Sequence, residues 1–308
     1  GIAKPHLPWV VPQSIANHYG NISDAEFEPT SYPSSYWKSK HLKWSHAPNK
    51  ELKSYTGWNS VSVADRARGY YGAVSFGDQQ VGRILTQLDS LEAANNTFVV
   101  FWGDHGFHLG DRDLWGKKTV FEQSTRVPFG IRPSANWLAA NPDAATNGIG
   151  AKVQAPTDSV DILPTILDLC NLTIPAQTER AGTSLVPLMK DPTAYVRSAA
   201  VSQFEAYGSK SRRGYSIRST NYRLIVYLPK YKVYKSSPTS LPYRKKTTKA
   251  RQALFYYETP GQVELVDRIN SAAHATAYKD LLKLYTQNAD RDWTHLIGVE
   301  PFDHPSNR

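Results

Sequence analysis

Residues 97–118 read TFVVFWGDHGFHLGDRDLWGKK and contain the strongest structural signal in the sequence. It begins with the apolar run 98–102, which is short and uninterrupted, as in a strand buried on both faces of a parallel sheet. The run stops at a Gly-Asp-His-Gly sequence. In open α/β sheets, ligands bind just beyond the carboxyl ends of the strands. The stretch therefore predicts an α/β fold with Asp104 and His105 side by side at a ligand site.

The side chains of this loop suit a divalent cation. Asp104 offers a hard carboxylate oxygen, and His105 can share the ion through a neutral imidazole. Further along the chain, Lys117 and Lys118 can return positive charge to the same place. The alternative is purely structural, because clusters of Gly and Asp commonly form turns that bind nothing. Spacing alone leaves both interpretations open.

The motif Gly-Asp-His-Gly-aromatic-x-Leu-Gly, followed by Leu-Trp-Gly-Lys, resembles the second metal-binding segment of the type I sulfatases. These enzymes are members of the alkaline-phosphatase-like superfamily, and the motif is similar to that of the iduronate sulfatase branch. The resemblance implies that Asp104 and His105 are metal ligands, with Ca²⁺ expected and Mg²⁺ as the alternative. It also implies that Lys117 binds the sulfate and helps to polarise the leaving oxygen. His108 and Lys118 lie nearby, but the family pattern does not select them.

A segment near the start of the chain carries another candidate side chain. Residues 1–12 contain three prolines, which exclude a regular helix and hold the segment extended. On its own, Lys-Pro-His is ordinary loop chemistry. Residues 4–8 (Lys-Pro-His-Leu-Pro) resemble the sulfatase segment that follows a central strand. The resemblance implies that His6 contacts the sulfate or donates a proton, and the strand expected before it is absent from the sequence.

Two helices are expected from apolar periodicity. The clearer one spans residues 66–93, and we expect it to pack on the sheet without touching substrate. Its apolar stripe consists of Val74, Val81, Ile84, Leu85, Leu88 and Leu91. The other should open at residues 158–159 and end at Cys170, which is expected to be a small buried hydrophobic residue. Glu122 and Arg126 have the spacing of a structural ion pair on a helical turn.

The last third of the chain changes to short, aromatic, β-prone pieces. Residues 214–218 and 221–227 alternate as in a β-hairpin with its turn near Ser219. This pattern resembles the small antiparallel C-terminal sheet of the sulfatases. We therefore expect an α/β fold with a mixed, mostly parallel sheet flanked by helices, followed by the antiparallel sheet. Residues 1–200 would form the C-terminal part of the catalytic domain, and residues 201–308 a small α+β subdomain.

Most of the excess positive charge lies in one segment. The net charge is +9, and residues 230–251 contain eight basic residues and no acidic one, which leaves +1 elsewhere. The candidate polyanion-binding residues are Arg244, Lys245, Lys246, Lys249 and Arg251. Such a patch attracts polyanions, which include sulfated glycans, nucleic acid and anionic membranes. No recognisable nucleic-acid module accompanies the patch. The alternative is a solvated loop that binds no ligand.

Several features bear on the compartment. No apolar run is long enough to span a bilayer. Cys170 is the only cysteine, so no internal disulfide can form. Sequons at Asn21, Asn95 and Asn171 indicate a glycoprotein, and Asn95 is the best candidate because it precedes the apolar run in an expected turn. The chain begins with neither an initiator Met nor a signal peptide, so we interpret it as a processed product or fragment, secreted or lysosomal.

The resemblance covers residues 4 to about 267 and leaves out three functional features of the family, one of which is a Lys-x-x-x-His contact to the sulfate. In sulfatases, a Cys-x-Pro-Ser-Arg segment supplies the cysteine that is oxidised to the formylglycine nucleophile, and paired Asp residues complete the metal shell. Cys170 lies in Leu-Cys-Asn-Leu-Thr and does not match. The expected function is therefore hydrolysis of sulfate esters, on a sulfated glycan, if an N-terminal sulfatase fragment or companion chain supplies the formylglycine.

Two other functions stay open. One is a non-catalytic, sulfatase-derived binding or structural protein, because the nucleophile is missing and the basic patch is concentrated. The other is a phosphoesterase of the same superfamily, which the combination of Lys-Pro-His with Trp-Gly-Lys disfavours. If the missing part supplies central strands, the strand at 98–102 should have an unpaired edge and an uncovered apolar face.

Overall fold

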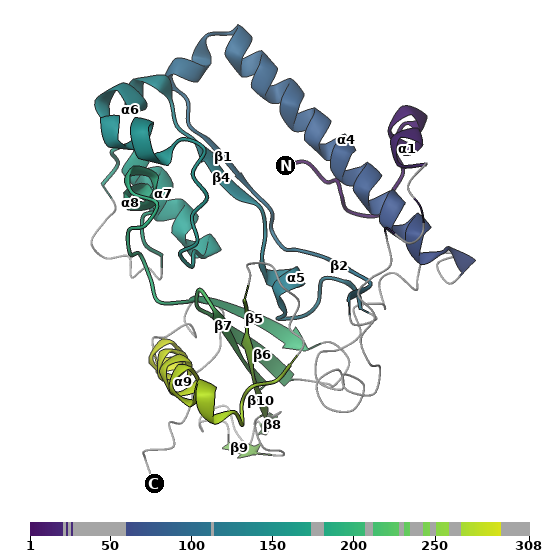
Figure 1. The fold of residues 1–308 in the computed structure, drawn as a ribbon, viewed down its shortest axis with the longest axis vertical. Helices are drawn as coiled ribbons and strands as arrows, with labels where there is room; N and C mark the ends of the chain where they lie inside the picture. The colour runs from purple at the N-terminus through teal and green to yellow at the C-terminus, as the bar shows by residue number, and fades with distance from the viewer. Residues whose placement is uncertain are drawn as a thin grey trace. The chain divides into compact units, whose positions relative to one another are not determined.

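The computed structural model divides the chain into two compact units (Figure 1). The described residues are 1–20, 23, 26, 60–111, 114–173, 182–206, 212–227, 231–234, 243–246, 251–258 and 266–290. Unit 1 comprises residues 1–118 and 126–142, and unit 2 comprises residues 119–125 and 143–308. The domain boundary at residue 200, expected from the sequence, remains a prediction.

Unit 1 contains the strand that the apolar run predicts. This strand, β1 (Val99–Trp102), pairs antiparallel with β4 (Phe129–Arg132). The expectation of burial on both faces is wrong, because Phe101 is 47% exposed and Trp102 is 48% exposed. Within the described ranges, β4 is the only strand paired with β1. The unpaired edge and uncovered apolar face expected for an incomplete sheet are therefore present in this part of the chain.

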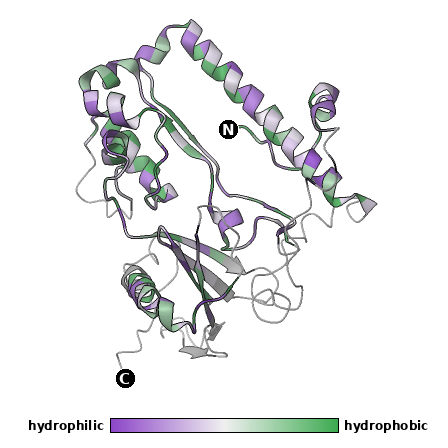
Figure 2. Cartoon of the chain, in the orientation of Figure 1, coloured by the Kyte–Doolittle hydropathy of each residue, from purple (hydrophilic) through white to green (hydrophobic). Residues whose placement is uncertain are grey.

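The long helix α4 (Val63–Ser90) matches the clearer predicted helix, displaced slightly toward the N-terminus. The hydroxyl of Ser62 caps it by accepting a hydrogen bond from the Asp65 amide at 3.0 Å. Its buried residues are small: Ala64, Ala67, Gly72, Ala73 and Gly77. Apolar and polar positions alternate along this helix in the hydropathy colouring (Figure 2). The predicted stripe is only partly covered, since Ile84 is 61% exposed and Leu91 66% exposed. None of the large aliphatic side chains of this helix is among the buried core residues that the structure describes.

The small residues of α4 have a different neighbour, which is the N-terminal segment. The short helix α1 (Gln13–Tyr19) packs against α4. A Cβ added at Gly72 would lie 3.5 Å from the Val11 side chain and 3.9 Å from the Ile15 side chain. These are ordinary van der Waals distances, so the N-terminal segment lies in contact with this face of the helix. Residues 1–20 are held on the first half of α4 in this way.

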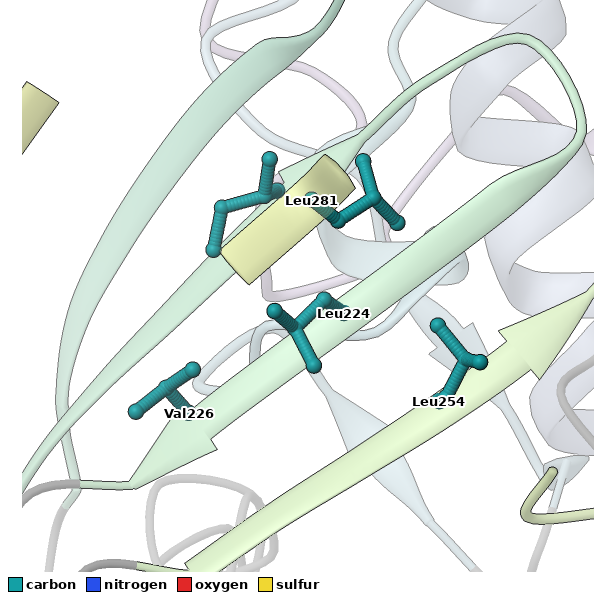
Figure 3. Packing of buried hydrophobic residues seen from close by; sticks show 5 residues of the cluster. Leu224, Val226, Leu254 and Leu281 are labelled. Atoms are coloured by element: carbon teal, nitrogen blue, oxygen red, sulfur yellow. The ribbon is translucent and has the colours of Figure 1, made fainter. Parts of the chain in front are cut away.

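Unit 2 is organised around a four-stranded antiparallel sheet with the strand order β10–β7–β6–β5. Its strands are β5 (Ala200–Ala206), β6 (Arg212–Arg218), β7 (Tyr222–Tyr227) and β10 (Arg251–Tyr256). The helix α9 (Ala275–Asp290) packs on it, and Leu281 of that helix lies in the core beside Leu224 (Figure 3). The predicted hairpin and the small antiparallel C-terminal sheet are thus confirmed.

The other described elements are short. In unit 1 they are η3 (Ala93–Asn96) and α6 (Ala135–Ala140), and in unit 2 they are α5 (Glu122–Thr125), η5 (Ala144–Gly148), η6 (Ser159–Asp161), α7 (Ile162–Leu169), α8 (Val186–Lys190), β8 (Tyr231–Tyr234), β9 (Tyr243–Lys246) and η7 (Ala272–His274). The second predicted helix is therefore found as η6 and α7. Cys170 at its end is exposed, contrary to the prediction, because Leu169 takes the buried position.

Unit 2 also holds a buried ion-pair network centred on Glu122. This carboxylate is 3% exposed and accepts hydrogen bonds from Arg218 Nε at 3.0 Å and from the Arg223 guanidinium. Arg223 is 1% exposed and also donates to the Val120 carbonyl at 3.0 Å and to the Tyr257 hydroxyl at 2.8 Å. The sequence pointed to Arg126 as the partner of Glu122, whereas these two arginines come from the sheet. Removing the carboxylate would leave buried cations without their counter-charge.

We predict that Glu122→Gln lowers the free energy of unfolding of unit 2 by about 3 kcal/mol, since breaking a buried ion pair leaves the remaining charge buried without a partner. Urea unfolding of the chain coexpressed with an N-terminal sulfatase fragment, followed by far-UV circular dichroism, measures this change. The exposed Asp280→Asn on α9 serves as the control and should shift the midpoint little. Equal effects of the two substitutions would contradict a structural role for the network.

Candidate functional site

The loop after β1 places Asp104 and His105 together at the surface. The Gly103 amide donates to the Pro128 carbonyl at 3.0 Å and so prolongs the pairing of β1 with β4. Asp104 follows, and its Oδ1 accepts a hydrogen bond from the His105 amide at 3.0 Å. The other carboxylate oxygen lies 3.5 Å from His105 Nε2. The Asp104 side chain is 85% exposed and the His105 side chain 38% exposed.

The hydrogen bonding of His105 fits a metal ligand. Its Nδ1 lies 3.0 Å from the Gly106 carbonyl, which can only accept, so this contact is a hydrogen bond when Nδ1 carries the proton. Nε2 then keeps its lone pair on the side of the Asp104 carboxylate. A backbone carbonyl that fixes the tautomer of a ligating histidine is a common outer-shell arrangement. The pair thus suits one divalent cation.

These two side chains would fill only part of a coordination shell. Ca²⁺ takes six to eight oxygen ligands, and Mg²⁺ takes six in an octahedron. No group of three or more His, Cys, Asp or Glu side chains that could hold a metal occurs in the part of the chain that the structure describes. Asp104 and His105 therefore fit a metal site that needs further ligands.

A hairpin returns the chain from this loop toward Lys117. The strands β2 (His108–Leu109) and β3 (Trp115–Gly116) pair antiparallel, with His108 opposite Gly116. Gly110 and Gly116 have φ values of 104° and 101°, in the left-handed region that favours glycine. Lys117 is half-buried and follows Gly116 directly. The His108 side chain is fully buried and belongs to the packing of unit 1 rather than to the exposed loop.

The N-terminal loop that carries His6 is fixed by hydrogen bonds between its own residues. The Trp9 indole donates to the Pro5 carbonyl at 3.0 Å, and Lys4 Nζ donates to the Pro8 carbonyl. The His6 amide donates to the Ala3 carbonyl at 2.9 Å. The imidazole itself is exposed, and its Nδ1 lies 2.8 Å from the Leu7 carbonyl. This loop therefore has a defined backbone shape and an accessible imidazole.

An aromatic cluster, which we call the Trp115 cluster, joins the three segments that carry the candidate residues. Trp115 is 5% exposed and packs against Leu7, Trp9, Phe107 and Leu109. Each of the three segments contributes to this cluster within three residues of His6, His105 or Lys117. Segments separated by about a hundred positions in the sequence thus meet at one core. This convergence is the strongest structural support for treating them as one site.

Two residues of α4 extend the Trp115 cluster. The Tyr70 ring stacks on Phe107 with centroids 5.1 Å apart, and the Arg66 guanidinium lies 5.5 Å from the centroid of Trp115. Burial raises the pKa of the Tyr70 phenol, so Tyr70 stays neutral and acts as an aromatic surface. Sequence reasoning missed these contacts, although aromatic residues inside all the motifs were a visible signal.

The remaining predicted sites are only partly described. Asn95 is exposed in η3, and Asn171 is exposed with a φ of 53°. Asn21 and Lys249 lie outside the described residues. Arg244, Lys245 and Lys246 belong to β9, and Arg251 begins β10, but the side chains of these four residues also lie outside the described part. The polyanion-binding patch therefore remains a prediction.

The structure also bears on membrane insertion. A membrane-spanning helix needs about 20 mostly apolar residues. Among the described helices, none combines that length with sufficient hydropathy.

Comparison with known sequences gives consistent results. The family model described as Sulfatase matches residues 4–172, and that of the N-sulphoglucosamine sulphohydrolase C-terminal region matches residues 110–236. An ulvan-active sulfatase from Formosa agariphila is 35% identical over 62% of this chain and 33% of its own length. Iduronate 2-sulfatase from Homo sapiens is 29% identical over 42% of this chain and 25% of its own length. The chain thus spans well under half the length of these relatives.

Comparison with solved structures shows the fold. A phosphonate monoester hydrolase from Silicibacter pomeroyi has a TM-score of 0.66 at 21% identity, covering 94% of this chain and 55% of its own. A protein solved with its substrate D-glucosamine-2-N,6-O-disulfate has a TM-score of 0.52 at 22% identity. The match covers 73% of this chain and 40% of that protein. These likenesses confirm the expected α/β fold class. Since its family model covers more than half of the residues, the chain belongs to the sulfatase family.

Proposed function

We propose that this chain forms part of an enzyme that hydrolyses sulfate esters on a sulfated sugar. The observation that carries the proposal is the Trp115 cluster, which holds the loop of His6, the loop of Asp104 and His105, and the hairpin before Lys117 on one core. Family membership supports the reaction class. The sulfated sugar is supported by the solved relative, whose substrate is a glucosamine disulfate.

In this proposal, the candidate residues divide between metal binding, sulfate binding and proton transfer. Asp104 and His105 hold part of the shell of a divalent cation, for which we prefer Ca²⁺ to Mg²⁺. When bound, such an ion stabilises negative charge on the transferring oxygens. Lys117 binds the sulfate and draws electron density from the leaving oxygen. His6, whose imidazole is exposed, contacts the sulfate or donates the proton that the departing alcohol requires.

The nucleophile must come from outside residues 1–308, since no Cys-x-Pro-Ser-Arg segment occurs in this sequence. We propose that an N-terminal sulfatase fragment or companion chain provides the formylglycine and the remaining metal ligands. Among the residues that the structure describes, β1 pairs on one edge only, which supports this, because a further strand could pair there and cover Phe101 and Trp102, each about half exposed. An exposed apolar face of this kind is uncommon on a soluble monomer.

The proposed location is the lysosome or the cell exterior. The sequons at Asn95 and Asn171 support it, because both asparagines are exposed in the structure and could accept a glycan. A matching mass shift after deglycosylation of the protein from its natural source would establish the modification.

The first prediction concerns catalysis. With an N-terminal sulfatase fragment coexpressed, the complex should hydrolyse 4-nitrophenyl sulfate or a sulfated glucosamine. Lys117→Ala should lower kcat/KM about 100- to 1,000-fold, because it removes one preorganised donor to a charged transition state. Lys118→Ala is the matched control from the adjacent position and should stay within about threefold. Turnover of phosphonate or phosphate monoesters in preference to sulfate esters would reassign the reaction class.

The second prediction concerns metal binding. Asp104→Ala should weaken Ca²⁺ binding to the same complex by at least about tenfold, as expected when a ligand or its support is lost. Isothermal titration calorimetry with CaCl₂ gives the affinity independently of turnover. Asp78→Asn, on the exposed face of α4, is the control. Unchanged affinity in Asp104→Ala would remove this loop from the metal site.

The third prediction concerns the open face of unit 1. This chain expressed alone should be insoluble or molten, because an unpaired strand edge and exposed apolar side chains promote aggregation. Coexpression with the N-terminal fragment should restore the soluble fraction, and Trp102→Ser should improve it in the chain alone. Sedimentation and dye binding to exposed apolar surface measure the effect. A monomeric chain that unfolds cooperatively without a partner would count against the companion.

A further inference from the structure

Trp9 is placed to control the position of His6. Its indole N–H donates to the Pro5 carbonyl at 3.0 Å, so the hydrogen bond spans the residue that carries the imidazole. Its ring also lies against α4 at Gly69, where an added Cβ would be only 3.2 Å from the Trp9 ring. No larger residue fits at Gly69 unless the indole moves. The loop is therefore tied to the helix through one side chain.

The same indole also contacts the segment that follows the Asp104–His105 pair. Its ring centroid lies 6.1 Å from that of Phe107 with an interplanar angle of 73°, and 5.8 Å from that of Tyr70 with an angle of 88°. Both are edge-to-face contacts of the favourable kind. Trp9 further packs on Trp115, two residues before Lys117. One side chain thus touches the loop of His6, the helix and both of the other site segments.

We propose that Trp9 is a positioning residue that fixes His6 relative to the Asp104–His105 pair and Lys117. This inference rests on the proposed function, because it assigns Trp9 a role in the same site. The physical reason is that moving a catalytic group by about 1 Å can lower the rate of the reaction about 100-fold, even when the protein stays folded. The indole N–H sets the shape of the loop, and the ring sets its distance from the other segments.

Trp9→Phe tests this role, because it removes the indole N–H and part of the ring but keeps an aromatic side chain. In the complex with the N-terminal fragment, kcat should fall between about 10- and 100-fold, with KM changed by less than about threefold. Trp137→Phe is a matched control within unit 1. Trp137 contacts Phe98 edge-to-face at 6.1 Å and 73°, which equals the Trp9–Phe107 geometry. The control should lose similar stability and keep its kcat.

A double-mutant cycle separates positioning from general loss of structure. If Trp9 acts through His6, Trp9→Phe should have little further effect in a His6→Ala background. Gly69→Ala displaces the same indole from the other side and should reproduce the fall in kcat. Equal falls for Trp9→Phe and Trp137→Phe, or fully additive effects of Trp9→Phe and His6→Ala, would overturn the proposal.

The failure of the proposed function gives a different pattern. If His6→Ala leaves kcat unchanged, the assignment of His6 is wrong and Trp9 has nothing to position. If the unmodified complex hydrolyses no sulfate ester, the reaction class itself fails and the role of Trp9 fails with it. If His6→Ala lowers kcat while Trp9→Phe does not, only the positioning role is wrong.

Discussion

The packing of Trp115 is the constraint on which the candidate site depends. The site residues come from loops, and loops hold no fixed geometry unless something packs beneath them. Trp115 is almost fully buried between side chains of the N-terminal loop and of the segment after β1. The same ring is covered by the Arg66 guanidinium of α4. The polar side chains can remain exposed because this apolar layer, not their own contacts, determines where the loops lie.

The sequence predicted the elements better than their surroundings. The apolar run located β1, and the Gly-Asp-His-Gly that follows it located the exposed pair Asp104 and His105. Periodicity located α4 but assigned its buried face to the large aliphatic residues. The structure buries the small residues instead, on the face of the helix that residues 1–20 contact. Hydropathy patterns show that a face is apolar, but they do not show what covers it.

Contacts between segments that are distant in the sequence could not be predicted from sequence patterns, for the same reason. Glu122 has an arginine at the spacing of a helical pair, yet its buried partners come from the sheet about a hundred positions later. The meeting of Trp9 with Phe107 is likewise invisible to spacing, because no periodicity links the two segments. Motifs could name His6 and Lys117 as candidates. The geometry that joins their segments depends on tertiary packing between side chains far apart in the sequence, which no local pattern records.

The sheets of the two units differ in how completely their apolar side chains are covered. In unit 2, Ile217, Leu224 and Leu254 are fully buried, and the charged group Glu122 is neutralised by two arginines. In unit 1, Phe101 and Trp102 of the strand beside the site are about half exposed. Burying an aromatic side chain contributes on the order of 2 kcal/mol, so leaving two open forgoes a sizeable part of the stability of a domain. A further strand that covered these two side chains would therefore stabilise unit 1. It would bind to β1, the strand that leads into Asp104 and His105.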